Sequence, residues 1–321
     1  MLRLDFPETL ILLFDNMQKF VSLFAGQGAQ TIGMGKDLAE AFPECAELCS
    51  RADSVLGFPL SKICFEGPAE ELVKTAVCQP AIFTVSAAAF TAFGKTHPEV
   101  RFSAAAGLSL GEWTALWAAG AVSFGEALRI LEARGRFMQE ACDAQASGMV
   151  SIVRVPAGVA EQIAAEAGCT VSNYNSSEQT VLSGGKEQLA EAVKIAAEKG
   201  ARAVVLQVAG AYHSKFMESA AVKFASVLAS AEITAPRIPV LSNFTGKPHG
   251  SPEEIKAAML AQITGSVRWT DNMAWLGADG ATALVEFGPG KVLTGLAKRE
   301  LPNAASYNVA TAEQAASAVS L

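Results

Sequence analysis

The chain has 321 residues, of which 50% are hydrophobic and 18% are charged, and its formal net charge at pH 7 is -7. This length suits one large domain, or a large domain with a small one inserted, and the acidic balance excludes nucleic acid as the main partner. No run approaches the roughly 20 apolar residues of a membrane span, so we expect no membrane association.

The start of the chain and the cysteines indicate a cytoplasmic protein. Residues 1–16 contain a short apolar run, but Asp5, Glu8 and Asp15 flank it, whereas a secretory signal has a basic start. We interpret these residues as an appendage of unknown role. The six cysteines form no Cys-x-x-Cys pair and have no neighbouring histidines, which indicates buried thiols in a reducing compartment and no metal site.

The first hundred residues alternate an apolar strand with helical patterns. Phe20–Ala25 is predicted to be a buried strand, and the Gly-flanked loop Gly26–Gln30 after it can bring backbone N–H groups close to a ligand. Helices are expected at 36–56, at 68–76 and at 80–95, the last two with a proline near their start.

The segment Gly107–Glu112 has the pattern Gly-x-Ser-x-Gly. It follows a short apolar run at 101–106 and precedes a helical pattern at 113–119. Strand, tight turn and helix in this order are the context of a nucleophile elbow, in which the serine hydroxyl stands exposed at the edge of a sheet. The following helix directs its free N–H groups at the same place. Ser109 is therefore the candidate nucleophile.

A small domain is predicted at residues 146–209. Its expected strands are 149–155, 169–175, 179–183 and 201–208, and its expected helices are 157–167 and 186–199. The order β-α-β-β-α-β is typical of a ferredoxin-like unit.

The segments on either side, 17–145 and 210–311, are predicted to form one large domain. Further elements expected there are helices from Ser123 to about Cys142, from Ser214 to Ser230, from Ser251 and from Gly290 to about Arg299, and strands at Ile238–Asn243 and Thr282–Phe287. Alternation of strands and helices favours an α/β fold with a mostly parallel sheet. The Ala/Ser-rich tail at 312–321 is expected to be frayed.

A serine hydroxyl needs a nearby base, and the chain has three histidines. His97 and His249 lie in polar or turn-rich loops, and we interpret both as solvated. His213 lies between an apolar strand and a helix start, so elimination makes it the candidate base.

The partner that orients His213 is open. No carboxylate is near it in sequence, and Asp271, Asp279 and Glu286 cannot be ranked. A backbone carbonyl can orient an imidazole instead. We therefore expect a Ser–His dyad with a carbonyl or amide as third member.

Six segments share their order and spacing with one known family. They are Phe24–Gln30, Gly107–Glu112, Arg134–Gln139, Asn173–Asn175, Gly210–Ser214 and Glu286–Leu293. Together they resemble the malonyl-CoA:acyl carrier protein transacylases over about residues 20–310. The resemblance implies a hydrolase-like α/β domain with an inserted ferredoxin-like domain, in agreement with the elements expected above.

The resemblance also implies a ping-pong reaction that supplies fatty acid synthesis. Ser109 would take malonyl from coenzyme A as an ester and yield it to the phosphopantetheine thiol of acyl carrier protein, with His213 as base and then acid. Backbone N–H groups of Gln27 and Leu110 would form the oxyanion hole. The main-chain carbonyl of Gln262 would orient the histidine.

The family specificity is implied to lie in Arg134, whose guanidinium would pair with the malonyl carboxylate. Gly135, costly inside a helix, fits a close approach to neighbouring backbone. Asn173 and Asn175 match family positions that line the cleft between the domains, although strand-end asparagines have the same pattern.

Two positions depart from the family pattern. Leu108 stands where histidine is usual, and Tyr212 stands where phenylalanine is common. The first departure bears on the rate of acyl turnover and the second on the choice of extender unit.

Three alternatives remain open: a serine esterase, thioesterase or lipase, an acyltransferase of polyketide synthesis with another extender unit, and a non-catalytic scaffold. We expect a monomer without a tightly bound cofactor, since the coenzyme A thioester is a substrate. Acyl carrier proteins are acidic, so basic residues of the small domain are docking candidates. These are Lys186, Lys194, Lys199 and Arg202.

Overall fold

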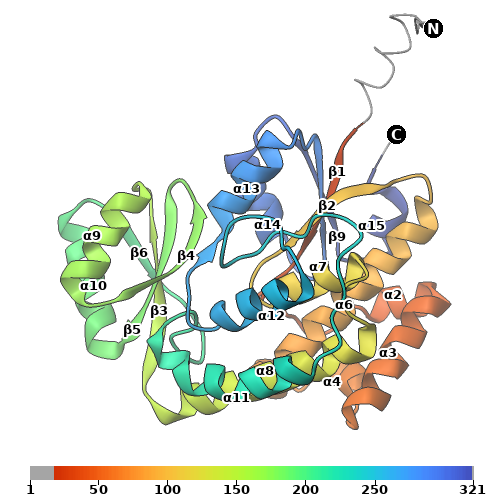
Figure 1. The fold of residues 1–321 in the computed structure, drawn as a ribbon, viewed down its shortest axis with the longest axis horizontal. Coiled ribbons are helices and arrows are strands. Elements are labelled where there is room, and N and C mark those ends of the chain that lie inside the picture. The colour runs from red at the N-terminus through yellow and green to blue at the C-terminus, as the bar shows by residue number, and fades with distance from the viewer. Residues whose placement is uncertain (1–17, 320–321) are drawn as a thin grey trace, which may run out of the picture.

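The computed structural model describes residues 18–319, so the predicted appendage at 1–16 lies outside the described residues. Two sheets organise these residues: a four-stranded sheet surrounded by helices in the large domain, and a five-stranded sheet in the small domain at the opposite end of the molecule (Figure 1). The expected α/β fold, a large domain with a parallel sheet and a second, smaller domain, is confirmed. The exact domain limits stay a prediction.

The sheet of the large domain has the strand order β2-β1-β8-β9, and all its pairs are parallel. Its strands are β1 Phe20–Phe24, β2 Phe102–Gly107, β8 Ala283–Phe287 and β9 Ala305–Val309. Every residue of β1 and β8 is buried, as expected for a parallel sheet covered by helices on both faces. Phe20 and Phe24 of β1 pack into one hydrophobic cluster, whereas Val21 and Leu23 pack into another on the opposite face.

Helices cover both faces of this sheet. They are α2 Lys36–Ala41, α3 Pro43–Leu56, α4 Leu60–Glu66, α5 Ala69–Leu72, α6 Thr75–Thr96, α7 Gly111–Ala118, α8 Phe124–Ala144, α11 Glu218–Ser230, α12 Pro252–Ala261, α13 Trp269–Ala278, α14 Val292–Glu300 and α15 Ala312–Ser317, with the 3-10 turn η1 Lys215–Met217 before α11.

Helix α6 corrects the expectation that no segment is apolar enough to span a membrane. By length and composition it would suffice, but 78% of its most apolar stretch is buried within the fold. Its side chains belong to the largest hydrophobic cluster of the protein. We therefore assign α6 as a core helix.

The sheet of the small domain has the order β6-β3-β5-β4-β7. Its strands are β3 Ser147–Val153, β4 Thr170–Ser176, β5 Gln179–Gly185, β6 Arg202–Val205 and β7 Val267–Arg268, and its helices are α9 Ala157–Ala167 and α10 Lys186–Glu198. The first four strands pair antiparallel, in the arrangement of a ferredoxin-like unit. The added strand β7 pairs parallel with β4, so the sheet of the small domain is not confined to residues 146–209.

The predicted helix at 36–56 is wrong in one respect, because it is two helices. Phe42 has an extended backbone (φ -127°, ψ 113°) and separates α2 from α3. Pro43 explains the break, since a proline disfavours the helical conformation of the residue before it. The next predicted helix, 68–76, contains only the short α5, and α6 begins at Thr75 rather than at residue 80.

Two expectations for the C-terminal half are also wrong. Ile238–Asn243 forms no regular strand and touches β2 only through a bridge between Ala105 and Val240. The tail, up to the last described residues, is not frayed: Thr311 caps α15, and Ala315 is fully buried. β9 and α13 have no counterpart among the expected elements.

The close approach expected at Gly135 is confirmed. A Cβ atom there would lie 2.5 Å from the backbone oxygen of Thr75 and 2.9 Å from Cα of Ala76. The missing side chain therefore lets α8 lie directly against the start of α6. This contact fixes the depth at which Arg134, the preceding residue, enters the protein.

We predict that Gly135→Ala lowers the free energy of unfolding by about 1 to 3 kcal/mol, the usual cost of overpacking, because the new methyl group meets backbone. Gly94→Ala is the matched control. Gly94 is also a helix glycine, but no atom lies within 4 Å of its added Cβ, so alanine there should stabilise the protein by up to about 1 kcal/mol. Denaturant unfolding of both variants measures the difference, and an unchanged Gly135→Ala protein would contradict the prediction.

Candidate active site

Ser109 occupies a strained corner between β2 and α7. Its φ angle is +54°, a left-handed conformation that non-glycine residues rarely adopt. A Cβ atom on Gly107 or Gly111 would collide with the backbone of the turn or of β1, so both positions require glycine. The side chain of Asn243 supports the corner by accepting the Ser109 N–H at 2.6 Å and donating to the Gly107 carbonyl at 2.8 Å.

His213 lies beside Ser109. Its Nε2 is 2.8 Å from the serine Oγ, and its Nδ1 is 2.7 Å from the main-chain oxygen of Gln262. A carbonyl oxygen only accepts, so Nδ1 carries the hydrogen and Nε2 of the neutral ring is free to accept the serine O–H. His213 also has a positive φ of 54°. The two residues expected to react therefore meet through two strained backbone positions.

None of the three carboxylates left open by the sequence orients His213. Asp271 pairs with Arg268 at 2.6 Å, and Asp279 pairs with Lys19 at 2.6 Å. Glu286 accepts the N–H groups of Leu293 and Thr294 at the start of α14. The group that orients His213 is instead the main-chain carbonyl oxygen of Gln262.

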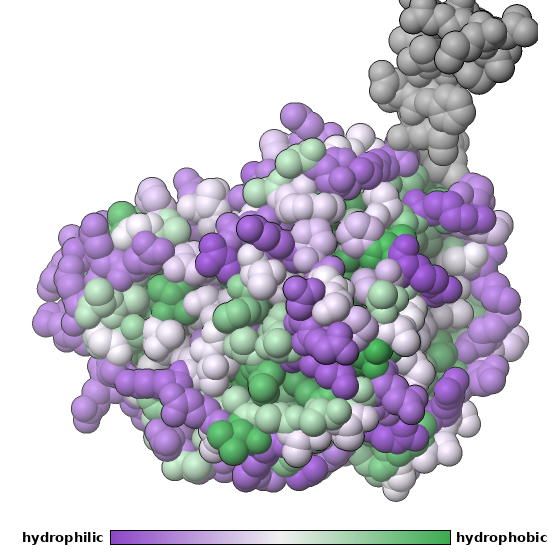
Figure 2. All heavy atoms as spheres, in the orientation of Figure 1, coloured by the Kyte–Doolittle hydropathy of each residue, from purple (hydrophilic) through white to green (hydrophobic). Residues whose placement is uncertain are grey.

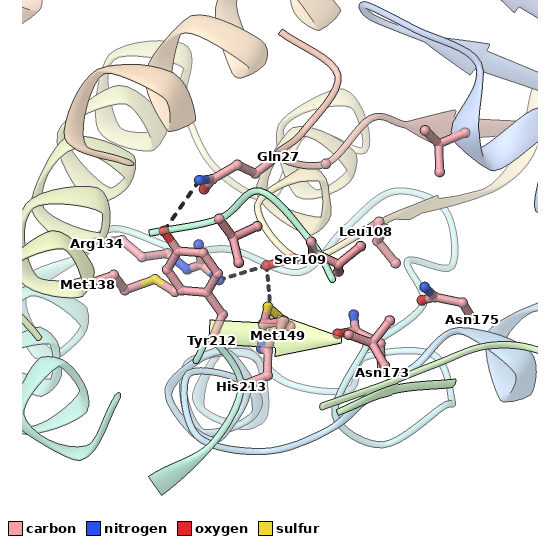
Figure 3. Close-up of a pocket in the computed structure, with 15 residues that line it drawn as sticks. Gln27, Leu108, Ser109, Arg134, Met138, Met149, Asn173, Asn175, Tyr212 and His213 are labelled. Atoms are coloured by element: carbon pink, nitrogen blue, oxygen red, sulfur yellow. Dashed lines mark hydrogen bonds between the residues drawn. The ribbon is translucent and has the colours of Figure 1, made fainter. Parts of the chain in front are cut away.

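Arg134 is almost fully buried, at 1% exposure, and points at the same serine. Its Nη2 donates to Ser109 Oγ at 3.1 Å and to Gln262 Oε1 at 2.8 Å, and its Nη1 donates to Gln79 Oε1 at 2.7 Å. Burial lowers the pKa of the guanidinium to about 10, so it stays charged at neutral pH. Figure 3 shows Arg134 and His213 directed at Ser109 from different sides.

The cation changes the protonation of His213. Burial, and then the nearby charge of Arg134, lower the pKa of the imidazole to about 4, although the hydrogen bond to Gln262 acts in the opposite direction. His213 is therefore neutral at pH 7. A neutral ring with a free Nε2 is the form that a general base requires.

Two backbone N–H groups beside the serine are free to donate. Within residues 18–319, neither Gln27 N nor Leu110 N has a hydrogen-bond partner. Leu110 follows the nucleophile at the start of α7, and Gln27 lies in the loop after β1. The Gln27 side chain lies near Tyr212, with 3.4 Å between Nε2 and the phenol oxygen. Free N–H groups at this position suit an oxyanion.

A cleft of about 220 Å³ opens above these groups, between the two sheets. Its lining includes Ser109, His213, Arg134, Gln27, Leu108, Tyr212, Asn173 and Asn175, together with several aliphatic side chains and two methionines. The amide oxygen of Asn175 is buried without a partner among the described residues. The departures at Leu108 and Tyr212 therefore both face the cleft.

The interpretation of His97 and His249 as solvated residues is wrong. His97 is 7% exposed and stacks on Phe93 with 4.5 Å between ring centres. The His249 side chain is 1% exposed, and its Nε2 lies 2.6 Å from a carboxylate oxygen of Glu112. Breaker-rich loops suggest exposure, but both loops turn their imidazole rings inward.

Three residues of the site were not predicted from the sequence. Gln79 and Asn243 hold Arg134 and the serine turn, and Glu112 accepts the side-chain amide of Gln262 at 2.6 Å. A signal existed for Gln79, since it is a polar residue inside the long apolar segment of α6. Glu112 belongs to the serine motif itself.

Comparisons of the sequence and of the structure with known proteins both identify acyl transferases as similar. Residues 21–317 match the acyl transferase domain family. The chain is 40% identical to a malonyl CoA-acyl carrier protein transacylase of Bacillus subtilis, over 88% of this chain and 90% of the relative. Its structure is similar to that of the transacylase from Coxiella burnetii, with a TM-score of 0.89, 32% identity, and coverage of 93% of this chain and 96% of the other.

A second similar structure is a malonyl-transacylase in complex with a type II polyketide synthase acyl-carrier protein. It has a TM-score of 0.89 and 35% identity, and the match covers 93% of this chain and 98% of that one.

We predict that the imidazole of His213 stays neutral down to about pH 4 and that Arg134→Met raises its pKa toward 6.5. Removing the cation removes one of the two causes that disfavour the imidazolium, and burial remains. Titration of the histidine ring signals by NMR measures both values. Arg136→Met, on the same helix but with half of its side chain exposed, is the control that should leave the pKa unchanged. A parent pKa near 6.5 would contradict the electrostatic description.

Proposed function

The chain belongs to the acyl transferase family, as one of the malonyl-CoA:acyl carrier protein transacylases, and we propose that it moves malonyl from malonyl-CoA to the phosphopantetheine thiol of acyl carrier protein through an ester on Ser109. The main observation in support of this proposal is a buried cation beside a serine–histidine pair. The Ser109 Oγ is 3.1 Å from Nη2 of Arg134 and 2.8 Å from Nε2 of His213.

In the first half-reaction, His213 takes the hydroxyl proton while Ser109 Oγ attacks the thioester carbonyl. The carbonyl oxygen becomes an oxyanion, which the N–H groups of Gln27 and Leu110 stabilise. The carbon–sulfur bond then breaks, and the thiol of coenzyme A leaves with the proton from His213. A malonyl ester remains on Ser109.

The second half-reaction is the reverse with another thiol. His213 takes the proton of the phosphopantetheine thiol, and the sulfur attacks the ester carbonyl. The bond to Ser109 breaks, and its oxygen recovers the proton from His213. The reaction needs no resident cofactor, because both acyl carriers are substrates and no electrons are transferred.

Arg134 accounts for the choice of acyl group. It donates three hydrogen bonds in the free protein, so one N–H on Nη1 and the Nε–H remain. Once Ser109 is esterified, the N–H that it accepted is also free. A malonyl carboxylate can then take two parallel hydrogen bonds from the guanidinium, which reduces the cost of burying both charges.

The site disfavours the hydrolase alternative. Hydrolysis of an ester or thioester does not require a buried cation next to the serine, whereas a malonyl ester carries a carboxylate that such a cation can bind. Supply of fatty acid synthesis remains the pathway we propose, in the cytoplasm and as a monomer. The polyketide alternative has the same chemistry and differs in the extender unit.

For docking of the acidic carrier protein, the four basic candidates differ. Lys194 and Lys199 pair with Glu191 and Glu166, whereas Lys186 and Arg202 are exposed and form no ion pair within the described residues. Hydrophilic residues gather on this end of the molecule (Figure 2). We propose Lys186 and Arg202 as the docking charges.

We predict that incubation with malonyl-CoA adds the mass of one malonyl group to the protein and that Ser109→Ala abolishes the addition. Intact-mass spectrometry measures the adduct. Adding acyl carrier protein should remove the adduct and produce malonyl carrier protein. Free malonate as the main product would favour the hydrolase, and a parent protein without an adduct would favour the scaffold.

We predict that Arg134→Ala lowers the rate of malonyl loading about 30-fold or more, equivalent to about 2 kcal/mol for a buried charged contact. Acetyl loading should fall less, because acetyl has no carboxylate. Arg136→Ala, two residues away on an exposed position, is the matched control. An unchanged ratio of malonyl to acetyl loading in Arg134→Ala would refute the role of the guanidinium.

A further inference from the structure

Behind the nucleophile, Glu112 carries a fully buried carboxylate that does not line the cleft. It lies in the first turn of α7, where the helix dipole favours a negative charge. Its Oε2 accepts the Gln262 amide at 2.6 Å and the backbone N–H of Asn243 at 2.9 Å. Its Oε1 lies 2.6 Å from Nε2 of His249. The carboxylate thus connects the start of α7 with a part of the chain more than 130 residues later.

Gln262 transmits these contacts to the reacting groups. It is 0% exposed and is the C-cap residue of α12. Its main-chain oxygen accepts Nδ1–H of His213, and its Oε1 accepts Nη2–H of Arg134. Its Nε2 also donates to the main-chain oxygen of Ser109 at 3.2 Å. One residue therefore touches the nucleophile, the base and the cation.

The orientation of the Gln262 amide is determined by the two charges on either side. Its NH2 group faces the carboxylate of Glu112, and its oxygen faces the guanidinium of Arg134. A flipped amide would bring donors against the cation and an oxygen against the carboxylate, so only one orientation is satisfied. The negative charge of Glu112 also raises the pKa of Arg134, against the effect of burial.

His249 holds the other oxygen of the carboxylate. Its backbone N–H donates to the Val240 carbonyl at 2.8 Å, which fixes the loop, and its side chain is 1% exposed. With both oxygens of Glu112 engaged, the carboxylate cannot rotate without losing a contact in the buried interior. Losing such a contact costs the desolvation of the group left unpaired.

We propose that Glu112 and His249 act as a positioning pair for the transfer reaction: His249 fixes the carboxylate of Glu112, and Glu112 fixes Gln262 and, through it, the directions of His213 and Arg134 at Ser109. This inference rests on the proposed function. Neither residue touches the acyl group. Small displacements of reacting groups are costly, since about 1 Å can reduce a rate by 10²-fold.

The test compares Glu112→Ala, Glu112→Gln and His249→Ala with the parent protein. Rapid-quench intact-mass spectrometry measures the rate of Ser109 loading at saturating malonyl-CoA and at saturating acetyl-CoA. We expect Glu112→Ala and His249→Ala to slow both loadings by a similar factor, about tenfold or more, because the Ser109–His213 pair is common to both. Glu112→Gln should recover most of the loss, since an amide oxygen can still accept from Gln262 and Asn243.

His97→Ala is the matched control. His97 is also a buried loop histidine, but it contacts Phe93 and Thr96 rather than the site. It should lower thermal stability and leave the loading rates of the folded protein unchanged.

Each result supports or overturns one of the two proposals. If the parent is not loaded, the proposed function fails. If the parent is loaded, the positioning pair is overturned by folded Glu112→Ala or His249→Ala proteins that load both acyl groups at the parent rate. It is also overturned by loss of malonyl loading alone, because a pair that positions His213 must slow both loadings. If Glu112→Ala does not fold, His249→Ala and Glu112→Gln carry the same comparison.

Discussion

A positive charge buried beside Ser109, the proposed nucleophile, is the constraint on which the rest of the site depends. Within the described residues, Arg134 forms no salt bridge, and its donors meet the side-chain oxygens of Gln79, Gln262 and Ser109. A buried cation costs several kcal/mol unless its surroundings compensate it. Neutral oxygens supply part of that compensation, and an anionic acyl group would supply more. Burial, and then the same charge, lower the pKa of His213, which keeps the ring in the neutral form that its proposed role as a base requires.

The fold supplies this arrangement through close backbone contacts and through β7, which follows α12 in the chain but pairs with a strand of the small domain. Gly135 lets α8 approach α6, so that Arg134 reaches Gln79. β7, five residues after Gln262, pairs with β4, the strand that carries Asn173. The residue that orients the base therefore lies in a segment tied to the wall of the cleft. The segments that make up the site are far apart in the chain and depend on both sheets.

The sequence was informative where a local pattern has one structural solution. The serine turn needs two glycines around a strained corner, and Gly168 ends α9 at the predicted residue. It was uninformative where tertiary contacts decide. Pro43 divides a continuous helical pattern, and Ile238–Asn243 has the composition of a strand but makes only two isolated bridges. Short edge elements such as β9 are determined by the neighbour that they pair with.

For the site, the same distinction holds. The reacting residues within motifs were identifiable, whereas the residues that support them were not, even where one of them, Glu112, lies in the serine motif. Gln79, Asn243 and Glu112 act through contacts with segments more than 50 residues away. His249 was misread because a loop of turn-forming residues does not reveal that one side chain is directed inward at a buried carboxylate.

The most direct test of the central claim is a crystal structure of the protein after loading with malonyl-CoA. The carboxylate of the Ser109 ester should lie within hydrogen-bond distance of the Arg134 guanidinium, in the place of the serine contact of the free protein. An ester whose carboxylate points to solvent, with Arg134 still bound only to Gln79 and Gln262, would contradict the account.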